Sequence, residues 1–139
     1  MALVEVSDSP DIVVLRTARG GRSLPVMRVV IGGVASRHDL PFDQLDDTQL
    51  AVETLLAEES LDGGELVLTV SGSGGAFVVR LDGLHNQSVK AALLATELFR
   101  PCAGCLLDVR MLLDSLVDGY RVQETAAGSF AVEMEKRTP

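Results

Sequence analysis

Short runs of β-branched residues alternate along the chain with longer stretches in which apolar residues recur every three or four positions. An apolar run at 11–18, followed by a pair of glycines, is typical of a strand that ends in a turn. Two further runs, 65–70 and 76–81, flank a Gly/Ser-rich loop and predict an antiparallel hairpin. Residues 120–124 and 129–136 predict a second hairpin, which closes the chain.

Four longer stretches have the spacing of apolar residues that is typical of helices. Ser23 and Asp43 lie near the start of the first two and are expected to act as N-caps, because their side-chain oxygens can accept a hydrogen bond from a free backbone N–H. Pro101 is expected to end the third helix. The predicted helices span residues 23–39, 41–60, 86–99 and 105–119. Their expected apolar sides are Val26, Val30 and Val34 with Met27 and Ile31 in the first, Leu45, Val52, Leu55 and Leu56 in the second, and Leu106, Val109, Leu113 and Leu116 in the fourth. The glycines at 63 and 64 are expected to stop the second helix.

Gly32 and Gly33 lie inside the first predicted helix. Each glycine costs about 1 kcal/mol relative to alanine in a helix interior. We therefore expect close packing against a neighbouring element at this point, with a break in the helix as the alternative.

The order of these elements predicts the fold class. One strand, two helices, two strands, two helices and two strands favour an α+β two-layer sandwich, in which one mixed, mostly antiparallel sheet carries helices on one face. Residues 1–10 are expected to be a loose lead-in, and residues 11–137 a single domain. A chain of 139 residues is long enough to bury a core of its own.

Charge narrows the range of partners. The formal net charge is −8, which disfavours binding to nucleic acid and to anionic membranes but is compatible with a basic protein partner. The N-terminus has no basic segment typical of a signal peptide, and the longest apolar stretch, residues 29–35, is too short to span a bilayer. We therefore expect a cytoplasmic protein that binds neither nucleic acid nor membrane.

A C-x-x-C motif, Cys102 and Cys105, precedes the last predicted helix. A helix N-terminus can activate a thiol, so a redox pair is one interpretation. Zinc needs about four ligands, and His38 and His85 lie at unrelated spacings, so no metal site is predicted. We favour a structural role for these small residues and keep a thiol-based redox switch as an alternative.

Three stretches, residues 27–56, 112–122 and 128–136, resemble in order and spacing the anti-sigma-factor serine kinases of bacteria. This family belongs to the histidine-kinase-like ATPase domains, and the resemblance runs from about residue 11 to residue 137. It implies the histidine-kinase-like ATPase fold and Mg-ATP as a cofactor. It also implies two partners, a sigma factor and an anti-anti-sigma protein that the kinase phosphorylates on serine.

The asparagine motif of that family is altered here. In the family, the general-base glutamate follows Leu-Ala-Val after one intervening residue. Counted from "LAV" at 50–52, that position holds Thr54 here, and Glu53 comes one residue early. One residue on a helix is a rotation of about 100°, so Glu53 is expected to point elsewhere. Glu58 stands where the family has the asparagine that holds Mg²⁺. A carboxylate can bind Mg²⁺, but it adds negative charge beside a triphosphate.

The two glycine motifs are altered as well. The family's Asp-x-Gly-x-Gly is reduced to Asp82 and Gly83, with this glycine one place early and the second one absent. The glycines that should meet the phosphates fall on Leu107 and Val109, and Gly104 lies three residues too early. Side chains at these points would block the close backbone approach that a phosphate needs.

With three nucleotide motifs altered, we predict an anti-sigma-factor-like regulator that acts by protein–protein binding, has a degenerate ATP site and needs no cofactor. Arg28 corresponds to an exposed arginine with which the family contacts partner proteins. The alternative is an active serine kinase that uses Mg-ATP through Glu53 or Glu58. A homodimer is left open.

Overall fold

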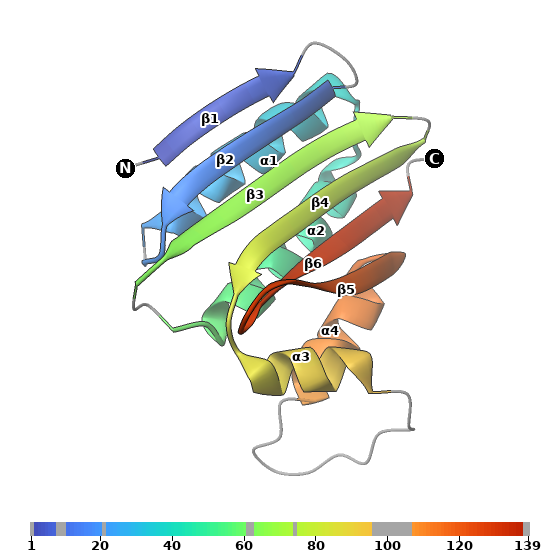
Figure 1. Ribbon diagram of the computed structural model, residues 1–139. Helices are drawn as coiled ribbons and strands as arrows, with labels where there is room; N and C mark the ends of the chain where they lie inside the picture. Colours follow the sequence, from blue (N-terminus) through green and yellow to red (C-terminus); the bar gives the residue numbers. More distant parts are fainter. Residues whose placement is uncertain are drawn as a thin grey trace.

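The computed structural model describes residues 2–7, 11–20, 22–60, 63–73, 75–95 and 107–137. Within them, an open six-stranded sheet with four helices packed against it forms an α+β protein (Figure 1). The strand order is β1-β2-β3-β4-β6-β5, and each neighbouring pair is antiparallel. The elements are β1 (Ala2–Ser7), β2 (Asp11–Ala18), α1 (Ser23–Arg37), α2 (Phe42–Ala57), β3 (Glu65–Ser73), β4 (Ala76–Leu84), α3 (Gln87–Leu94), α4 (Leu107–Leu116), β5 (Gly119–Ala126) and β6 (Ser129–Arg137).

The expected α+β class is confirmed, with two corrections. The sheet is antiparallel throughout the described strands rather than mixed, because each strand runs opposite to its neighbour. Residues 2–7, expected in a loose lead-in, form strand β1, which pairs with β2 from Ala2↔Thr17 to Ser7↔Ile12. The pattern gave no signal for β1 because Leu3 and Val4, which point to opposite faces, both stay exposed.

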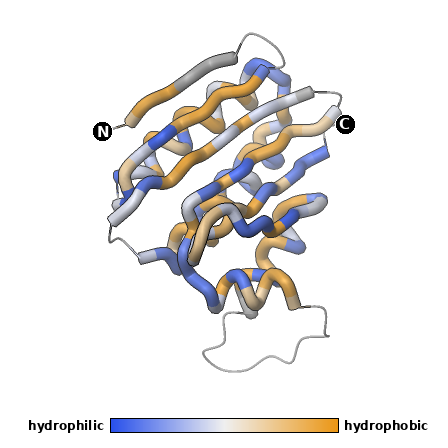
Figure 2. The backbone as a smooth tube through the Cα atoms, in the orientation of Figure 1, coloured by the Kyte–Doolittle hydropathy of each residue, from blue (hydrophilic) through white to orange (hydrophobic). Residues whose placement is uncertain are grey.

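Alternating side chains of the strands divide the sheet into a buried and an uncovered face. α1 and α2 lie behind the sheet in Figure 1, and α4 packs on α2. Hydrophobic and hydrophilic residues alternate along the central strands in Figure 2. Both predicted hairpins are confirmed, and β3 and β4 continue far enough into their Gly/Ser-rich loop to leave only residues 74 and 75 between them. The buried face carries Leu66, Leu68, Val70, Phe77, Val79, Leu81, Phe130, Val132 and Met134.

The start of α1 differs from the expectation. Ser23 is the first helical residue rather than the N-cap, and its hydroxyl donates to the carbonyl oxygen of Gly20 at 2.7 Å. Arg22 holds the N-cap position without a side-chain capping bond. The predicted apolar side of the helix is confirmed, since Met27, Ile31 and Val34 are buried and Val26 and Val30 pack against the core while partly buried.

The expectation for Gly32 and Gly33 is wrong in both forms. α1 runs through them without a break. A Cβ added at Gly32 would meet only the Nε2 atom of Gln49, at 3.9 Å, and one added at Gly33 would meet nothing within 4 Å. These glycines therefore lie on an open side of α1 and are not there for close packing.

α2 begins after Pro41, and Asp43 lies in its first turn without making a capping bond. The N-cap predicted for Asp43 is therefore wrong, although a carboxylate in the first turn still interacts favourably with the helix dipole. The predicted apolar side is confirmed by Val52 and Leu55, which are buried. The helix ends at Ala57, before the glycines expected to stop it.

α3 ends at Leu94 rather than near residue 99, because Ala95 adopts an extended conformation (φ −62°, ψ 129°). Pro101, the residue expected to end it, lies outside the described residues. α4 buries Val109, Leu113 and Leu116, as predicted. None of the helices described is long and apolar enough to cross a membrane.

Candidate functional site

The ends of β2, α2 and β4 meet at one place, which we call the junction and define by Arg19, Glu59, Gly83, His85 and Asn86. Arg19 follows β2, Glu59 follows α2, Gly83 lies near the end of β4, and the last two residues connect β4 to α3. The junction is built from segments that are far apart in the sequence.

A buried ion pair forms the centre of the junction. The Nη1 atom of Arg19 lies 2.7 Å from the Oε1 atom of Glu59, and the two side chains are only 1% and 4% exposed. The Nη2 atom of Arg19 donates to the carbonyl oxygen of Gly83. Its Nε atom is buried and has no partner among the described residues. Removing either partner of such a pair leaves an uncompensated buried charge, which is strongly destabilising.

Glu59 also binds the backbone at the start of α3. Its Oε1 atom accepts the backbone N–H of His85 at 2.7 Å, and its Oε2 atom accepts that of Asn86 at 2.8 Å. The side chain of Asn86 then caps α3 by accepting the N–H groups of Ser88 and Val89. Its amide donates to the carbonyl oxygen of Glu58 at 2.6 Å. One carboxylate and one asparagine thus join the end of α2 to the start of α3.

Gly83 is required by the backbone of the junction. Its φ is +95°, and an added Cβ would lie 2.4 Å from the carbonyl oxygen of Glu65. The β4–β6 register shifts between Asp82 and Leu84, so the chain makes a bulge at this residue. The sequence marked Gly83 as the remnant of a nucleotide motif, and the structure gives it a steric reason independent of any ligand.

A depression of about 340 Å³ lies beside the junction and is lined by Glu58, Glu59, Ser60, His85 and Asn86. Glu58 is exposed at the C-cap of α2. Of the degenerate nucleotide-motif positions, Glu58 lines this depression, and Gly83 contributes its carbonyl oxygen to the adjacent junction.

Asp82 faces the other way. In the register of β4 it pairs with Val67 and Ala131 on the uncovered face of the sheet, away from the helices. Its Oδ1 atom accepts the backbone N–H of Gly83 at 2.6 Å and the hydroxyl of Thr125 at 2.9 Å. The structure therefore does not bring Asp82 and Glu58 to one site.

The altered asparagine motif lies on the exposed part of α2. Glu53 forms an ion pair with Arg28 of α1, with exposed fractions of 23% and 52% for the two side chains. Thr54, at the position of the general base, donates its hydroxyl to the carbonyl oxygen of Leu50 at 2.8 Å. Glu53 is thus engaged with α1 through its ion pair with Arg28.

The outer α1–α2 surface, which we define by Arg28, Val29, Phe42, Leu50 and Glu53, combines one ion pair with exposed apolar side chains. Val29 is 74% and Phe42 76% exposed, and Leu50 is exposed as well. Isolated apolar side chains on a surface are common. Val29 directly follows the half-exposed Arg28 in α1, and an arginine beside an exposed apolar side chain is a common feature of protein-binding surfaces.

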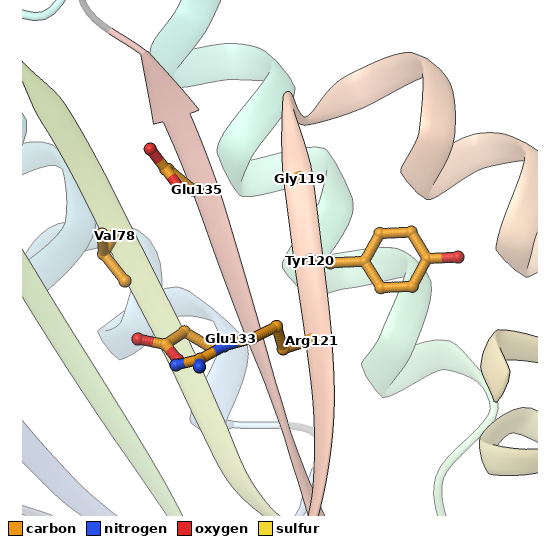
Figure 3. A pocket seen from close by; sticks show the side chains of 6 residues that line it. All are labelled: Val78, Gly119, Tyr120, Arg121, Glu133 and Glu135. Atoms are coloured by element: carbon orange, nitrogen blue, oxygen red, sulfur yellow. The ribbon is translucent and has the colours of Figure 1, made fainter.

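The uncovered face of the sheet has a depression of about 400 Å³ (Figure 3). Arg121 pairs with Glu133 in it, and this hydrogen bond and charge raise the pKa of Arg121. Figure 3 shows Tyr120 pointing away from the depression. Burial and the charge of Asp114 raise the pKa of Tyr120. A smaller depression of about 260 Å³ shares Arg121 and Glu133. Two of the charges that line these depressions, those of Arg121 and Glu133, are therefore already paired with each other.

Cys102, Gly104 and Cys105 lie outside the described residues, as does the side chain of Leu107. Val109 is buried in the core, where it packs as an ordinary apolar residue of α4. In the part of the chain that the structure describes, no group of three or more His, Cys, Asp or Glu residues could hold a metal ion. His38 is only partly exposed, and its Nε2 atom lies 2.8 Å from the Oδ2 atom of Asp11.

The Arg19–Glu59 pair was missed by the sequence analysis. Arg19 stands between a strand and a pair of glycines, and Glu59 follows an acidic helix end, so each reads as a solvated charge. The buried character of the pair depends on how the segments meet, and the hydrophobic pattern carries no signal for it. No protein-family model matches the chain, and no curated protein shows significant similarity to it.

Proposed function

We propose that this protein is an anti-sigma-factor-like regulator that acts by binding protein partners, a sigma factor or an anti-anti-sigma protein, without using nucleotide. One observation carries the proposal: the Glu53 carboxylate is engaged with Arg28 on the outer α1–α2 surface. A glutamate held by this arginine is available for recognition of a protein partner, and we propose that it does not activate a serine hydroxyl beside ATP.

The order of the elements supports the fold that the resemblance implies. Two helices precede a hairpin, two more follow it, and a second hairpin closes the sheet. This is the order predicted from the sequence, with β1 added at the edge, although the sheet is antiparallel among the described strands rather than mixed. We therefore assign the chain to that fold as part of the proposal.

The charges around the altered motifs argue against a bound triphosphate. Glu58 and Glu59 lie next to each other at the end of α2, and both line the depression beside the junction. Carboxylates at that point repel phosphate groups unless a cation intervenes. The arginine of the junction does not offer a free charge there, because Glu59 already pairs with it.

The outer α1–α2 surface offers the features that a protein partner needs. Val29 and Phe42 can enter apolar pockets of a partner, whereas Arg28 can exchange its bond with Glu53 for a carboxylate of that partner. Asp43 and Asp46 near the start of α2 add negative charge, which suits a partner with basic residues.

The first test is titration of the purified protein with ATP, with and without Mg²⁺, by calorimetry. We expect no binding at micromolar concentrations. Micromolar affinity that requires Mg²⁺ would favour the alternative, a serine kinase that uses Glu53 or Glu58, and phosphorylation of an anti-anti-sigma protein would establish it.

The second test is direct binding to sigma factors and anti-anti-sigma proteins from the host, measured by surface plasmon resonance. Arg28→Ala should weaken binding by about 30-fold, the typical effect of removing an arginine hot spot worth about 2 kcal/mol. Arg16→Ala is the matched control, because Arg16 pairs with Glu65 in a similarly exposed position on the opposite face of the sheet. Equal effects of the two variants, or binding to none of these proteins, would contradict the proposal.

A further inference from the structure

The carboxylate of Glu59 is held as a bound anion would be. Both of its oxygens accept hydrogen bonds, from the N–H groups of His85 and Asn86 at 2.7 and 2.8 Å. The guanidinium of Arg19 lies 2.7 Å from one of them. Backbone N–H groups combined with an arginine are the donors with which proteins commonly bind carboxylates and phosphates.

The hydrogen-bond donors to the Glu59 carboxylate come from segments of the chain other than the one that contains Glu59. Arg19 follows β2 and is also tied to the carbonyl oxygen of Gly83, so contacts other than those with Glu59 help to position it. The two backbone N–H groups lie in the connection between β4 and α3. The Nε atom of Arg19 is buried without a partner among the described residues, so the guanidinium has unused donor capacity.

We propose that Arg19 and the N–H groups of His85 and Asn86 form a carboxylate-binding site that the protein fills with its own Glu59. The side chain acts as an internal ligand that closes this site to external anions and fixes the start of α3. The proposal does not depend on the identity of the protein partner. It predicts that α3 is held in place without any external molecule.

Asn86 connects the carboxylate-binding site to the start of α3. The same residue that donates its N–H to Glu59 also caps the helix through its side chain. Loss of the internal anion should therefore release the cap and the first turn of α3, whereas the central strands keep their own packing.

The test is chemical rescue of Glu59→Ala, which removes the anion and leaves the donors. We expect its thermal midpoint to fall by about 10–20 °C, the usual result of leaving one partner of a buried pair uncompensated. Sodium formate at tens of millimolar should restore part of the loss, with sodium chloride at equal ionic strength as the reference. The amide resonances of His85 and Asn86 should shift on addition of formate.

Two control variants separate a specific site from a general salt effect. Glu58→Ala removes a neighbouring exposed carboxylate and should show no response to formate. Arg19→Met combined with Glu59→Ala removes the cation of the site and should abolish the rescue. The proposal is overturned if formate stabilises these variants as much as it stabilises Glu59→Ala, or if it stabilises none of them.

If Glu59→Ala does not fold, Glu59→Gln gives a second measurement, because it keeps the size of the side chain and loses its charge and one acceptor oxygen. We expect hydrogen exchange of the His85 and Asn86 amides and of α3 to accelerate at least about 10-fold relative to β3. Unchanged protection of these amides would overturn the proposal.

Discussion

Two glutamates, one on α2 and one just beyond its end, pair with arginines and illustrate how environment decides the role of an ion pair. Glu59 and Arg19 are almost completely buried, at 4% and 1% exposure, whereas Glu53 and Arg28 are 23% and 52% exposed. The buried pair also binds backbone groups at the end of β4 and in its connection to α3, and the exposed pair only bridges two helices. The first is part of the architecture, and the second is free to exchange partners.

The energetic reason is desolvation. A charge taken out of water depends largely on its oppositely charged partner for compensation, so the loss of that partner is expensive. A pair in contact with water loses little when it breaks, because solvent replaces the partner, and its net contribution is about 0–1 kcal/mol. The same chemistry therefore produces a structural element at the junction and an adaptable contact on the outer α1–α2 surface.

Arg19→Met tests the difference between the buried and the exposed ion pair and is expected to have the largest effect. We expect it to lower the free energy of unfolding by about 3–5 kcal/mol, because the Glu59 carboxylate stays buried without its cation. Urea denaturation followed by circular dichroism measures this loss. Arg28→Met is the matched control and should stay within about 1 kcal/mol of the parent protein. Similar losses for the two variants would remove the distinction between the pairs.

A double variant tests whether the two buried charges depend on each other. Arg19→Met combined with Glu59→Leu removes both buried charges, so it should be less destabilised than the sum of the two single variants. Additive losses would show that the two side chains do not depend on each other.

Gly83→Ala tests the backbone of the junction without touching its charges. The new Cβ would meet the carbonyl oxygen of Glu65 at 2.4 Å, at a residue with φ +95°. We expect a loss of about 2–4 kcal/mol in urea denaturation, from strain together with displacement of β4. Gly128→Ala is the control, because Gly128 also has a positive φ but has nothing within 4 Å of its added Cβ.

Gly33→Ala tests the open side of α1, and it is expected to raise the stability of the fold rather than lower it. The added methyl group meets nothing within 4 Å, and alanine favours the helix, so we expect the free energy of unfolding to rise by about 0.5–1 kcal/mol. Thermal unfolding monitors the gain. A decrease in stability would mean that this side of α1 is packed more closely than the structure indicates.

The smallest expected effect comes from Lys90→Met, which removes an exposed ion pair. A hydrogen bond and the positive charge from Lys90 lower the pKa of Glu124 below its usual value of 4.5. A group with a lowered pKa in the folded state stabilises the fold above that usual value, and this contribution disappears as the pH falls through the lowered pKa. We therefore expect a slight loss of stability at neutral pH that vanishes in acid. A variant equal to the parent at every pH would show that solvent screens this pair completely.

The periodic elements could be predicted well from the sequence, whereas the candidate site could not. Val52 and Leu55 mark the inner side of α2 by spacing alone, and the residues around the Gly/Ser-rich loop mark their hairpin. The caps assigned to Ser23 and Asp43 were wrong because many residues can occupy the N-cap position, and the start of a helix is set by its flanking turn. The strand β1 was missed because it is an edge strand with only one neighbour, and its described side chains at Ala2, Leu3 and Val4 are exposed.

By itself, the sequence determined the α+β class, the two hairpins and the inner sides of the helices, because burial of apolar surface follows the period of each element. Only the tertiary structure decided which charges lie inside. Arg19 and Glu59 resemble surface residues in the sequence. Their burial results from the meeting of the ends of β2, α2 and β4 at the junction. The environment of a charge depends on all the groups around it in space, and that environment is not encoded in its near neighbours along the chain.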